Sequence, residues 1–201
     1  MAILTIDEVK NIVEDFISEN QSKLECKKYG FEEILRREGD QDQIIYIVKE
    51  GVFRIGKLDT WEPDITVAFC FKSDIFISLS AVAPCFPSLF HIKSIKNNLC
   101  NYNEIYEISI EQWNYLVEKN DKFKNILTSI SHYNLTMVLN VFSIFRKNKK
   151  TKEFLNAMYD MKHPILNSGI SNKYLADFFG TTPNTLLQIL AEKQLEEAKK
   201  K

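Results

Sequence analysis

Residues 171–193 (SNKYLADFFGTTPNTLLQILAEK) carry the side chains whose types and spacing could do the most specific chemistry in this chain. They read as two short helices joined at Gly180, because glycine adopts the left-handed backbone that ends a helix at least cost. Ser171 is a natural N-cap for the first helix, and Thr182 caps a second helix that begins at Pro183. This layout is that of a helix-turn-helix, in which the second helix enters the major groove of DNA.

Each of these two helices has an apolar stripe that would pack inward. The first stripe is Tyr174, Leu175, Phe178 and Phe179, and the second is Leu186, Leu187, Ile189 and Leu190. A helix pair of this kind also occurs in all-α domains that do not bind DNA, so its surface chemistry has to decide between the two readings.

The exposed side of the second helix carries polar groups that can contact base edges, namely Asn184, Thr185 and Gln188. Gln188 can make a bidentate contact with adenine, so we expect a preference for A·T-rich half-sites; weak or lost sequence reading is the alternative. The groups placed to position the phosphate backbone are Lys173, Thr182 and Lys193.

The charge of the chain is unevenly distributed. Residues 146–201 carry 11 Lys and Arg against 6 Asp and Glu, so residues 1–145 carry 15 against 21. The formal net charge of −1 therefore hides an acidic body and a basic C-terminal segment. A basic segment of this kind attracts phosphate, although a solvated lysine face and the final three lysines account for part of the excess.

The elements that would position these residues follow from the change of hydrophobic period along the chain. A helix is predicted from Thr5 to Phe16 or Ile17, and residues from about 26 to 108 read as short β-strands separated by turn signals. Among them are strands 44–48, 52–58, 65–71 and 105–108. Many short strands at this spacing predict a barrel or jelly roll.

After Ser109, an N-cap that Gln112 completes as a capping box, the helical period returns and continues for a long way. Seven residues are spaced alternately by four and three, which is an a/d seam suited to a partner helix. They are Phe123, Leu127, Ile130, Asn134, Met137, Val141 and Ile144. This seam predicts self-association, with Asn134 as a register-setting polar pair across a two-fold axis. A short helix containing Phe154, Leu155 and Met158 follows Thr151.

A β-barrel, a long dimerisation helix and a C-terminal helix-turn-helix, in that order, resemble the Crp/Fnr family of bacterial transcription regulators. The resemblance is strongest at residues 45–54, which look like the hairpin of the family with its glycine at Gly51, and at residues 174–186, which look like its recognition module. It implies an α+β fold whose barrel is a jelly roll (double-stranded β-helix). It also implies three parts: a cyclic-nucleotide-binding-like sensor at 1–120, a dimerisation helix at 121–147 and a DNA-binding domain at 148–201.

The resemblance implies an effector pocket in the barrel, for which Ser78, Ser80 and Ser88 are the candidate residues. Relatives that bind cyclic nucleotides hold the phosphate with an Arg-Ser or Arg-Thr pair. Here Ser88 matches the hydroxyl residue, whereas Pro87 stands at the arginine position. A buried phosphate without its arginine loses its main charge-assisted partner, so cyclic AMP and cyclic GMP are not the expected effectors.

The sequence does not fix a cofactor. The four cysteines show no Cys-x-x-Cys spacing and suggest neither a zinc site nor a disulfide framework, and Cys26 alone cannot supply the iron–sulfur cluster of the oxygen-sensing relatives. Haem ligation by His91 or His132 stays open. We expect no metal site and no catalytic activity, because no Ser/His/Asp or Cys/His set is arranged by spacing. The N-terminus lacks a signal peptide and no apolar run is long enough to span a membrane, so we expect a cytoplasmic protein.

Together these patterns predict a transcription regulator that binds double-stranded DNA as a homodimer and senses an effector through its N-terminal domain. A small-molecule effector and RNA polymerase are further partners that the resemblance admits. The leading alternative is a signal-binding or protein-interaction module that keeps the barrel and the dimer helix but no longer reads DNA. A cyclic-nucleotide sensor is the third reading.

Overall fold

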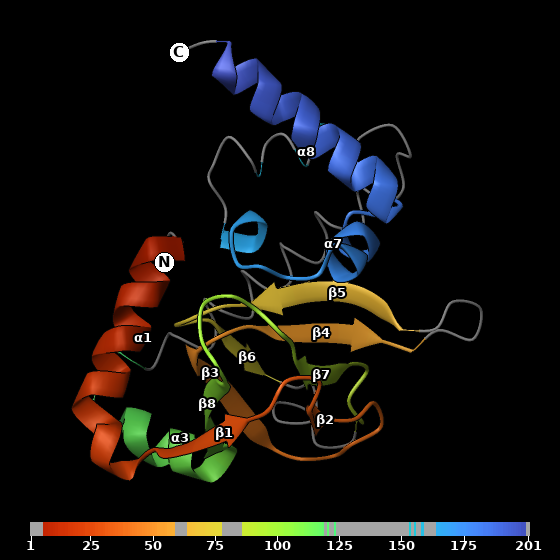
Figure 1. Ribbon diagram of the computed structural model, residues 1–201. Helices are drawn as coiled ribbons and strands as arrows, with labels where there is room; N and C mark the ends of the chain where they lie inside the picture. Colours follow the sequence, from red (N-terminus) through yellow and green to blue (C-terminus); the bar gives the residue numbers. More distant parts are fainter. Residues whose placement is uncertain are drawn as a thin grey trace.

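The computed structural model describes residues 6–58, 64–77, 86–118, 120, 123, 153, 155, 158 and 164–199. The described elements comprise two antiparallel sheets and a set of helices around them (Figure 1). The strands are β1 (Glu25–Tyr29), β2 (Ile34–Arg36), β3 (Ile44–Glu50), β4 (Phe53–Lys57), β5 (Ile65–Cys70), β6 (Ile75–Ile77), β7 (His91–Ser94) and β8 (Asn103–Ser109). The helices are α1 (Ile6–Asn20), α3 (Ile110–Glu118), α7 (Asn172–Phe178) and α8 (Pro183–Ala198), with 3₁₀ turns at Gln21–Lys23 and Pro164–Leu166.

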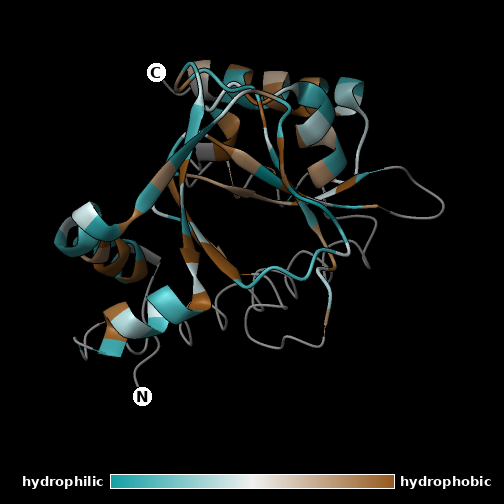
Figure 2. Cartoon of the chain, turned by 90° about the horizontal axis from the view of Figure 1, so that it is seen from below, coloured by the Kyte–Doolittle hydropathy of each residue, from teal (hydrophilic) through white to brown (hydrophobic). Residues whose placement is uncertain are grey.

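The two sheets have four strands each, in the orders β1-β8-β3-β6 and β2-β7-β4-β5. Strands far apart in sequence pair within each sheet, and this crossing of the chain between two sheets is a jelly-roll arrangement. We call the two sheets together the roll. The prediction of an α+β fold with an N-terminal β-roll is therefore confirmed, and hydrophobic segments of its strands appear in brown in Figure 2.

Each hydrophobic cluster belongs to a different layer of the fold. Between the sheets lie the inward residues of both, among them Tyr46, Phe53, Phe76 and Ile92. On the far side of the first sheet, α1 and α3 pack on the outward residues around Trp113, which is 1% exposed. The third cluster covers the outer side of the second sheet with C-terminal residues.

The N-terminal helix and the helix after β8 form largely as their sequences indicate. Helix α1 ends at Asn20, three or four residues beyond the predicted end, and Asn20 donates its side-chain amide to the carbonyl of Phe16. The Ser109 hydroxyl accepts the amide N–H of Gln112 at 3.1 Å, so the predicted N-cap is confirmed. The side chain of Gln112, predicted to complete a capping box, donates to the carbonyl of Lys23 at 2.7 Å.

Helix α3 ends just before Asn120, the last residue of the predicted sensor part. Helix α3 ends at Glu118, and Asn120, although its N–H bonds the carbonyl of Val117, is not helical. Asparagine side chains compete with the backbone for hydrogen bonds and so favour the end of a helix. Here the side-chain amide of Asn120 donates to Glu19 of α1.

Candidate nucleic-acid interface

The C-terminal pair α7–α8 forms at the predicted positions with the predicted caps. Ser171 accepts the N–H of Tyr174 at the start of α7, and Thr182 accepts the N–H of Thr185 at 3.2 Å at the start of α8. Gly180 lies between them with a φ of +61°, in the left-handed region that glycine adopts without strain. The N–H of Thr181 reaches back to the carbonyl of Ala176, which closes the end of α7.

One residue of the apolar stripe predicted to be buried on α8 is exposed to solvent. Leu186 is fully buried and Ile189 is 8% exposed, but Leu187 is 48% exposed. Successive helical residues are 100° apart, so Leu187 lies about 130° from the centre of a stripe formed by Leu186 and Ile189, on the polar side of the helix. An exposed leucine therefore stands beside Gln188.

The structure gathers all six predicted DNA-contact residues on α7–α8 and on the turn that joins them. Five are exposed and Lys193 is half-buried. The exposed residues are Lys173, Thr182, Asn184, Thr185 and Gln188.

The polar side chains of α8 already interact with one another. The hydroxyls of Thr182 and Thr185 lie 2.9 Å apart, and the Gln188 amide donates to the Glu192 carboxylate at 3.4 Å. Glu192 and the exposed Glu196 continue the face of Gln188 at four-residue intervals, so this side of α8 becomes acidic after its first two turns.

Helix α7 is docked on the outer side of the second sheet around a buried arginine. The Arg54 side chain is 0% exposed and donates to the Asp64 carboxylate at 2.6 Å and to the Thr66 hydroxyl at 2.7 Å. Its guanidinium also lies 3.6 Å from Asp177 of α7, 4.9 Å from the ring of Tyr174 and 3.3 Å from His91. We call these residues the Arg54 cluster: Arg54, Asp64, Thr66, His91, Tyr174 and Asp177.

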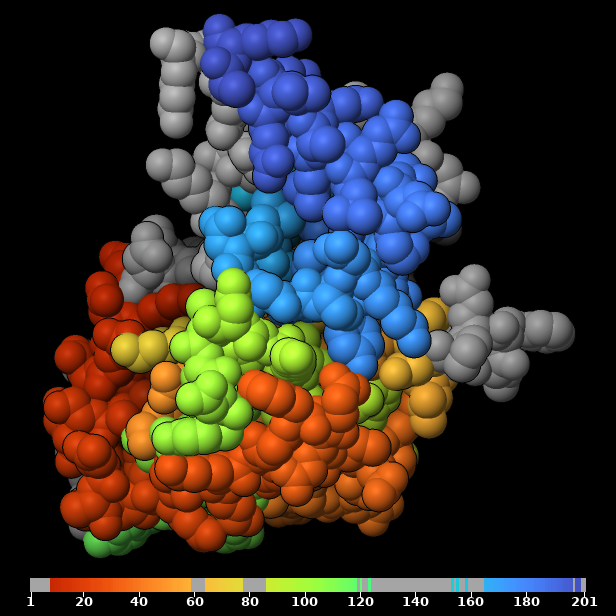
Figure 3. All heavy atoms as spheres, in the orientation of Figure 1, coloured from red at the N-terminus to blue at the C-terminus, as the bar shows by residue number. Residues whose placement is uncertain are grey.

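Further bonds join the roll to the C-terminal segment. The backbone N–H of Thr66 donates to Asp177, and the Tyr174 hydroxyl donates to Glu32 at 2.8 Å. Burial and the nearby Glu32 raise the pKa of Tyr174, so its hydroxyl stays a donor. Asn98 also donates its N–H to the carbonyl of Ser168 at 2.8 Å. In Figure 3 the light blue residues around 164–180 rest directly on the roll.

Sequence reasoning missed this docking. The partners are far apart in the sequence, as in the 111-residue interval between Thr66 and Asp177. No local pattern reports such a pairing. The one signal was Tyr174, a partly polar residue in the apolar stripe of α7, where a buried tyrosine hydroxyl needs a partner.

His91 is the member of the Arg54 cluster whose protonation bears on the pH dependence of stability. Its Nε2 lies 2.9 Å from Asp64 Oδ1, an interaction that haem ligation at this nitrogen would break. Burial lowers the pKa of His91 below its ordinary value of 6.5; Asp64 opposes the shift and Arg54 adds to it.

We expect this depressed pKa to make folding less favourable in mild acid. Below pH 6.5 the unfolded chain binds a proton at His91 that the folded chain resists, so stability is lost as pH falls through the folded pKa. His91→Gln removes this contribution. Urea unfolding between about pH 7.5 and 5 should therefore show a smaller drop in midpoint for the variant than for the wild type. Equal drops would contradict the assignment.

The effector-pocket candidates are only partly described. Ser88 is buried, its N–H donates to the carbonyl of Asp40, and its hydroxyl donates to the carbonyl of Phe90 at 2.6 Å. Its hydroxyl is thus engaged within its own loop. Ser78 and Ser80 lie outside the described residues, so the pocket stays a prediction.

The interior of the roll contains a buried ion pair that the sequence did not indicate. Arg36 is paired in register with Ile92 and so faces the space between the sheets, where its 0% exposed side chain forms an ion pair with Asp42. Tyr46, stacked on Phe76 at 5.0 Å, donates its hydroxyl to the same carboxylate. Burial and Asp42 raise the pKa of Tyr46. The space between the sheets therefore contains the guanidinium of Arg36.

Only the first residue of the predicted dimer seam is described. Phe123 is 1% exposed and packs edge-on against Phe16, with ring centroids 5.1 Å apart, inside the cluster of α1 and α3. The other six seam residues lie outside the described part, so the seam stays a prediction.

Two negative findings concern the described residues alone. Among them, no three His, Cys, Asp or Glu side chains form a group that could hold a metal ion. None of the helices in the same part of the chain has both the length and the apolar character needed to cross a bilayer.

Comparison with known proteins identifies the fold. No protein-family model and no curated protein sequence matches this chain. FixK2 from Bradyrhizobium japonicum has a similar structure, with a TM-score of 0.69 and 15% identity over 87% of this chain and 86% of that one. CLP, a c-di-GMP-responsive global regulator from Xanthomonas campestris, has a TM-score of 0.62 and 15% identity over 92% and 93%.

A Crp/Fnr family protein from Eubacterium rectale is similar too, with a TM-score of 0.57 and 18% identity over 96% of this chain and 85% of that one. These matches extend over the roll and the C-terminal helices together. At such identities they establish the architecture and leave individual residue roles open. The chain therefore has the fold of the Crp/Fnr transcription regulators.

Proposed function

We propose that the protein is a transcription regulator that binds double-stranded DNA as a homodimer, with α7–α8 as its helix-turn-helix. The observation that carries the proposal is the N-terminal end of α8, where the first two turns of a capped helix present Asn184, Thr185 and Gln188 to solvent. These side chains stand where the second helix of such a motif meets base edges. The basic C-terminal segment supports phosphate binding, and we expect the protein to act in the cytoplasm.

The exposed position of Leu187 extends this proposal. In the major groove an apolar side chain contacts the methyl group of thymine, while the amide of Gln188 pairs with adenine. The two neighbours together favour A·T-rich half-sites. The residues from Leu127 to Ile144 of the predicted seam would join the two protomers, because Phe123 already packs inside its own chain against Phe16.

Selection from a random duplex library tests the proposal. A regulator of this kind should enrich an inverted repeat with A·T-rich halves. Its affinity should fall steeply with salt: Lys173 and Lys193 from two protomers give a slope of about −3 to −4 in log K against log salt. No enrichment by a protein that is dimeric in solution, or a flat salt dependence, would contradict DNA binding.

Gln188→Ala separates base reading from general affinity. We expect the variant to lose about 1–3 kcal/mol of discrimination between adenine and the other bases at one position, while binding to random DNA is kept. Competition titrations with single-base variants of the selected site measure this. Lys173→Ala is the matched control and should weaken all sequences alike.

A second candidate function is a signal-binding or protein-interaction module that has lost specific DNA reading. The observation that favours it is the acidic face of α8, where Glu192 and Glu196 follow Gln188 and Lys193 is the one basic residue of the helix. Carboxylates repel phosphate, so this face weakens non-specific binding. The same selection decides between the two candidates.

A further inference from the structure

We propose that Arg54 is a positioning residue for DNA reading. From the second sheet of the roll, it holds α7, and with it α8, at the orientation that sets the distance between the two α8 helices of a dimer. This inference rests on the proposed function and assigns separate roles to two groups of residues. Residues of α8 read bases, and the Arg54 cluster fixes the half-site spacing.

The guanidinium of Arg54 is shared between the roll and α7. On the roll side it is bound by Asp64 and Thr66, both within 2.7 Å. On the other side Asp177 and the ring of Tyr174 cover it. A fully buried cation needs such partners, since desolvation without compensation is costly. Moving α7 off the sheet would expose one face of the guanidinium and free the N–H of Thr66, so the docked position is specified by charge as well as by packing.

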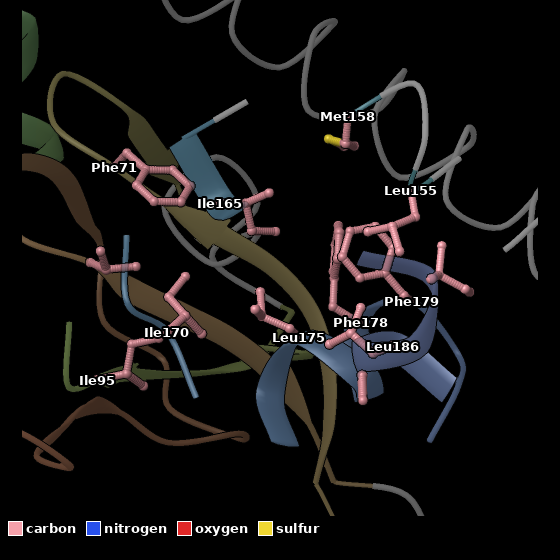
Figure 4. Close-up of a cluster of buried hydrophobic side chains, with 13 residues drawn as sticks. Phe71, Ile95, Leu155, Met158, Ile165, Ile170, Leu175, Phe178, Phe179 and Leu186 are labelled. Atoms are coloured by element: carbon pink, nitrogen blue, oxygen red, sulfur yellow. The ribbon is translucent and has the colours of Figure 1, made fainter. Parts of the chain in front are cut away.

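The position of α7 is passed on to α8 through a short turn and a shared core. Residues 179–182 are all that separate the two helices. Phe178, Phe179 and Leu186 lie in one buried cluster with Phe71 of the roll (Figure 4). Phe69 of β5 also meets Phe178, with ring centroids 5.4 Å apart. A close-packed core transmits a shift of one helix to its neighbours. Fixing α7 therefore fixes the direction of α8 relative to the sheet.

This arrangement makes spacing and base preference separable. In a symmetric dimer, both second helices must reach half-sites about one helical turn apart, at about 34 Å. The bases at each half-site are chosen by the tip of α8, which lies outside the Arg54 cluster. Loosening the cluster should therefore relax the spacing that the dimer accepts and leave the base preference of each half-site unchanged.

The experiment measures binding to a set of duplexes that carry the wild-type half-sites at every spacer length across about one helical turn (about 10 base pairs). Asp177→Ala is the main variant, because it removes the α7 partner of both Arg54 and Thr66 while alanine keeps α7 helical. Arg54→Met is the second variant. Lys28→Met is the matched control: Lys28 also lies over an aromatic ring, 4.2 Å from the centroid of Tyr102, but on the other sheet.

We expect the wild type and Lys28→Met to prefer the best spacer over its neighbours by about tenfold or more, and Asp177→Ala to reduce this preference to about threefold or less. Single-base competition at one half-site should be the same for all proteins. Hydrogen exchange at the Thr66 amide should be faster in Asp177→Ala, which reports the loss of its acceptor directly.

Three results would overturn the inference. If Asp177→Ala loses thermal stability but keeps the wild-type spacer preference, the cluster is structural only. If spacer and base preference weaken together, the cluster acts on α8 folding rather than on its placement. If the wild type enriches no duplex, the proposed function fails, and the inference fails with it. If Arg54→Met does not fold, Asp177→Ala alone decides, since its side chain is a third exposed.

Discussion

Gly51→Ala should destabilise the protein by at least about 4 kcal/mol, a large part of the roughly 5–15 kcal/mol by which an ordinary domain is stable. Gly51 has a φ of +90°, and a Cβ built there would lie 1.9 Å from Oδ1 and 2.6 Å from Cγ of Asn103. An alanine at this positive φ costs backbone strain of about 1–3 kcal/mol. The contact between the new Cβ and Asn103 forces Asn103 to move.

Asn103 cannot move cheaply because it is the hydrogen-bond centre of the roll. Its side chain is fully buried and donates to the carbonyls of Val52 and Ile95 and to the hydroxyl of Ser94. Its oxygen accepts the N–H of Val52 at 3.2 Å. Each buried group left unsatisfied costs about 1–3 kcal/mol.

Gly39→Ala is the matched control for this substitution. Gly39 has nearly the same φ, +91°, but a Cβ there would meet no atom within 4 Å. Gly39→Ala should cost the backbone strain alone, about 1–3 kcal/mol. Chemical denaturation of both variants measures the difference. If both lose the same stability, the contact with Asn103 contributes nothing.

The sequence was most informative where structure is local. The caps at Ser109, Ser171 and Thr182 and the turn at Gly180 depend on residues three or four apart, and all of them form as predicted. The roll was predicted as a class, since short alternating strands between turn signals have few other solutions. The pairing order of its strands is non-local and could not be read from the chain.

In the candidate site, too, the local part was predictable from the sequence and the non-local part was not. The six DNA-contact residues lie within 21 positions of one another, so helical spacing sufficed to gather them on α7–α8. The Arg54 cluster draws on β4, β5, β7 and α7, and its members meet only because the fold brings them together. The prediction that Leu187 is buried was wrong for a local reason: a short apolar run does not show which of its members faces outward.

Arg54→Met should have the second-largest effect, about 3 kcal/mol of lost stability, because it deletes a fully buried cation from between two carboxylates. Asp64 and Asp177 then face each other without it, although both are about a third exposed and recover some hydration. Lys93→Met is the matched control. It breaks an ion pair with Glu32, whose side chain is 49% exposed, and should cost no more than about 1 kcal/mol. Urea midpoints at neutral pH measure both variants. A loss for Arg54→Met no larger than for Lys93→Met would mean that the Arg54 guanidinium holds α7 to the roll no more strongly than an exposed ion pair does.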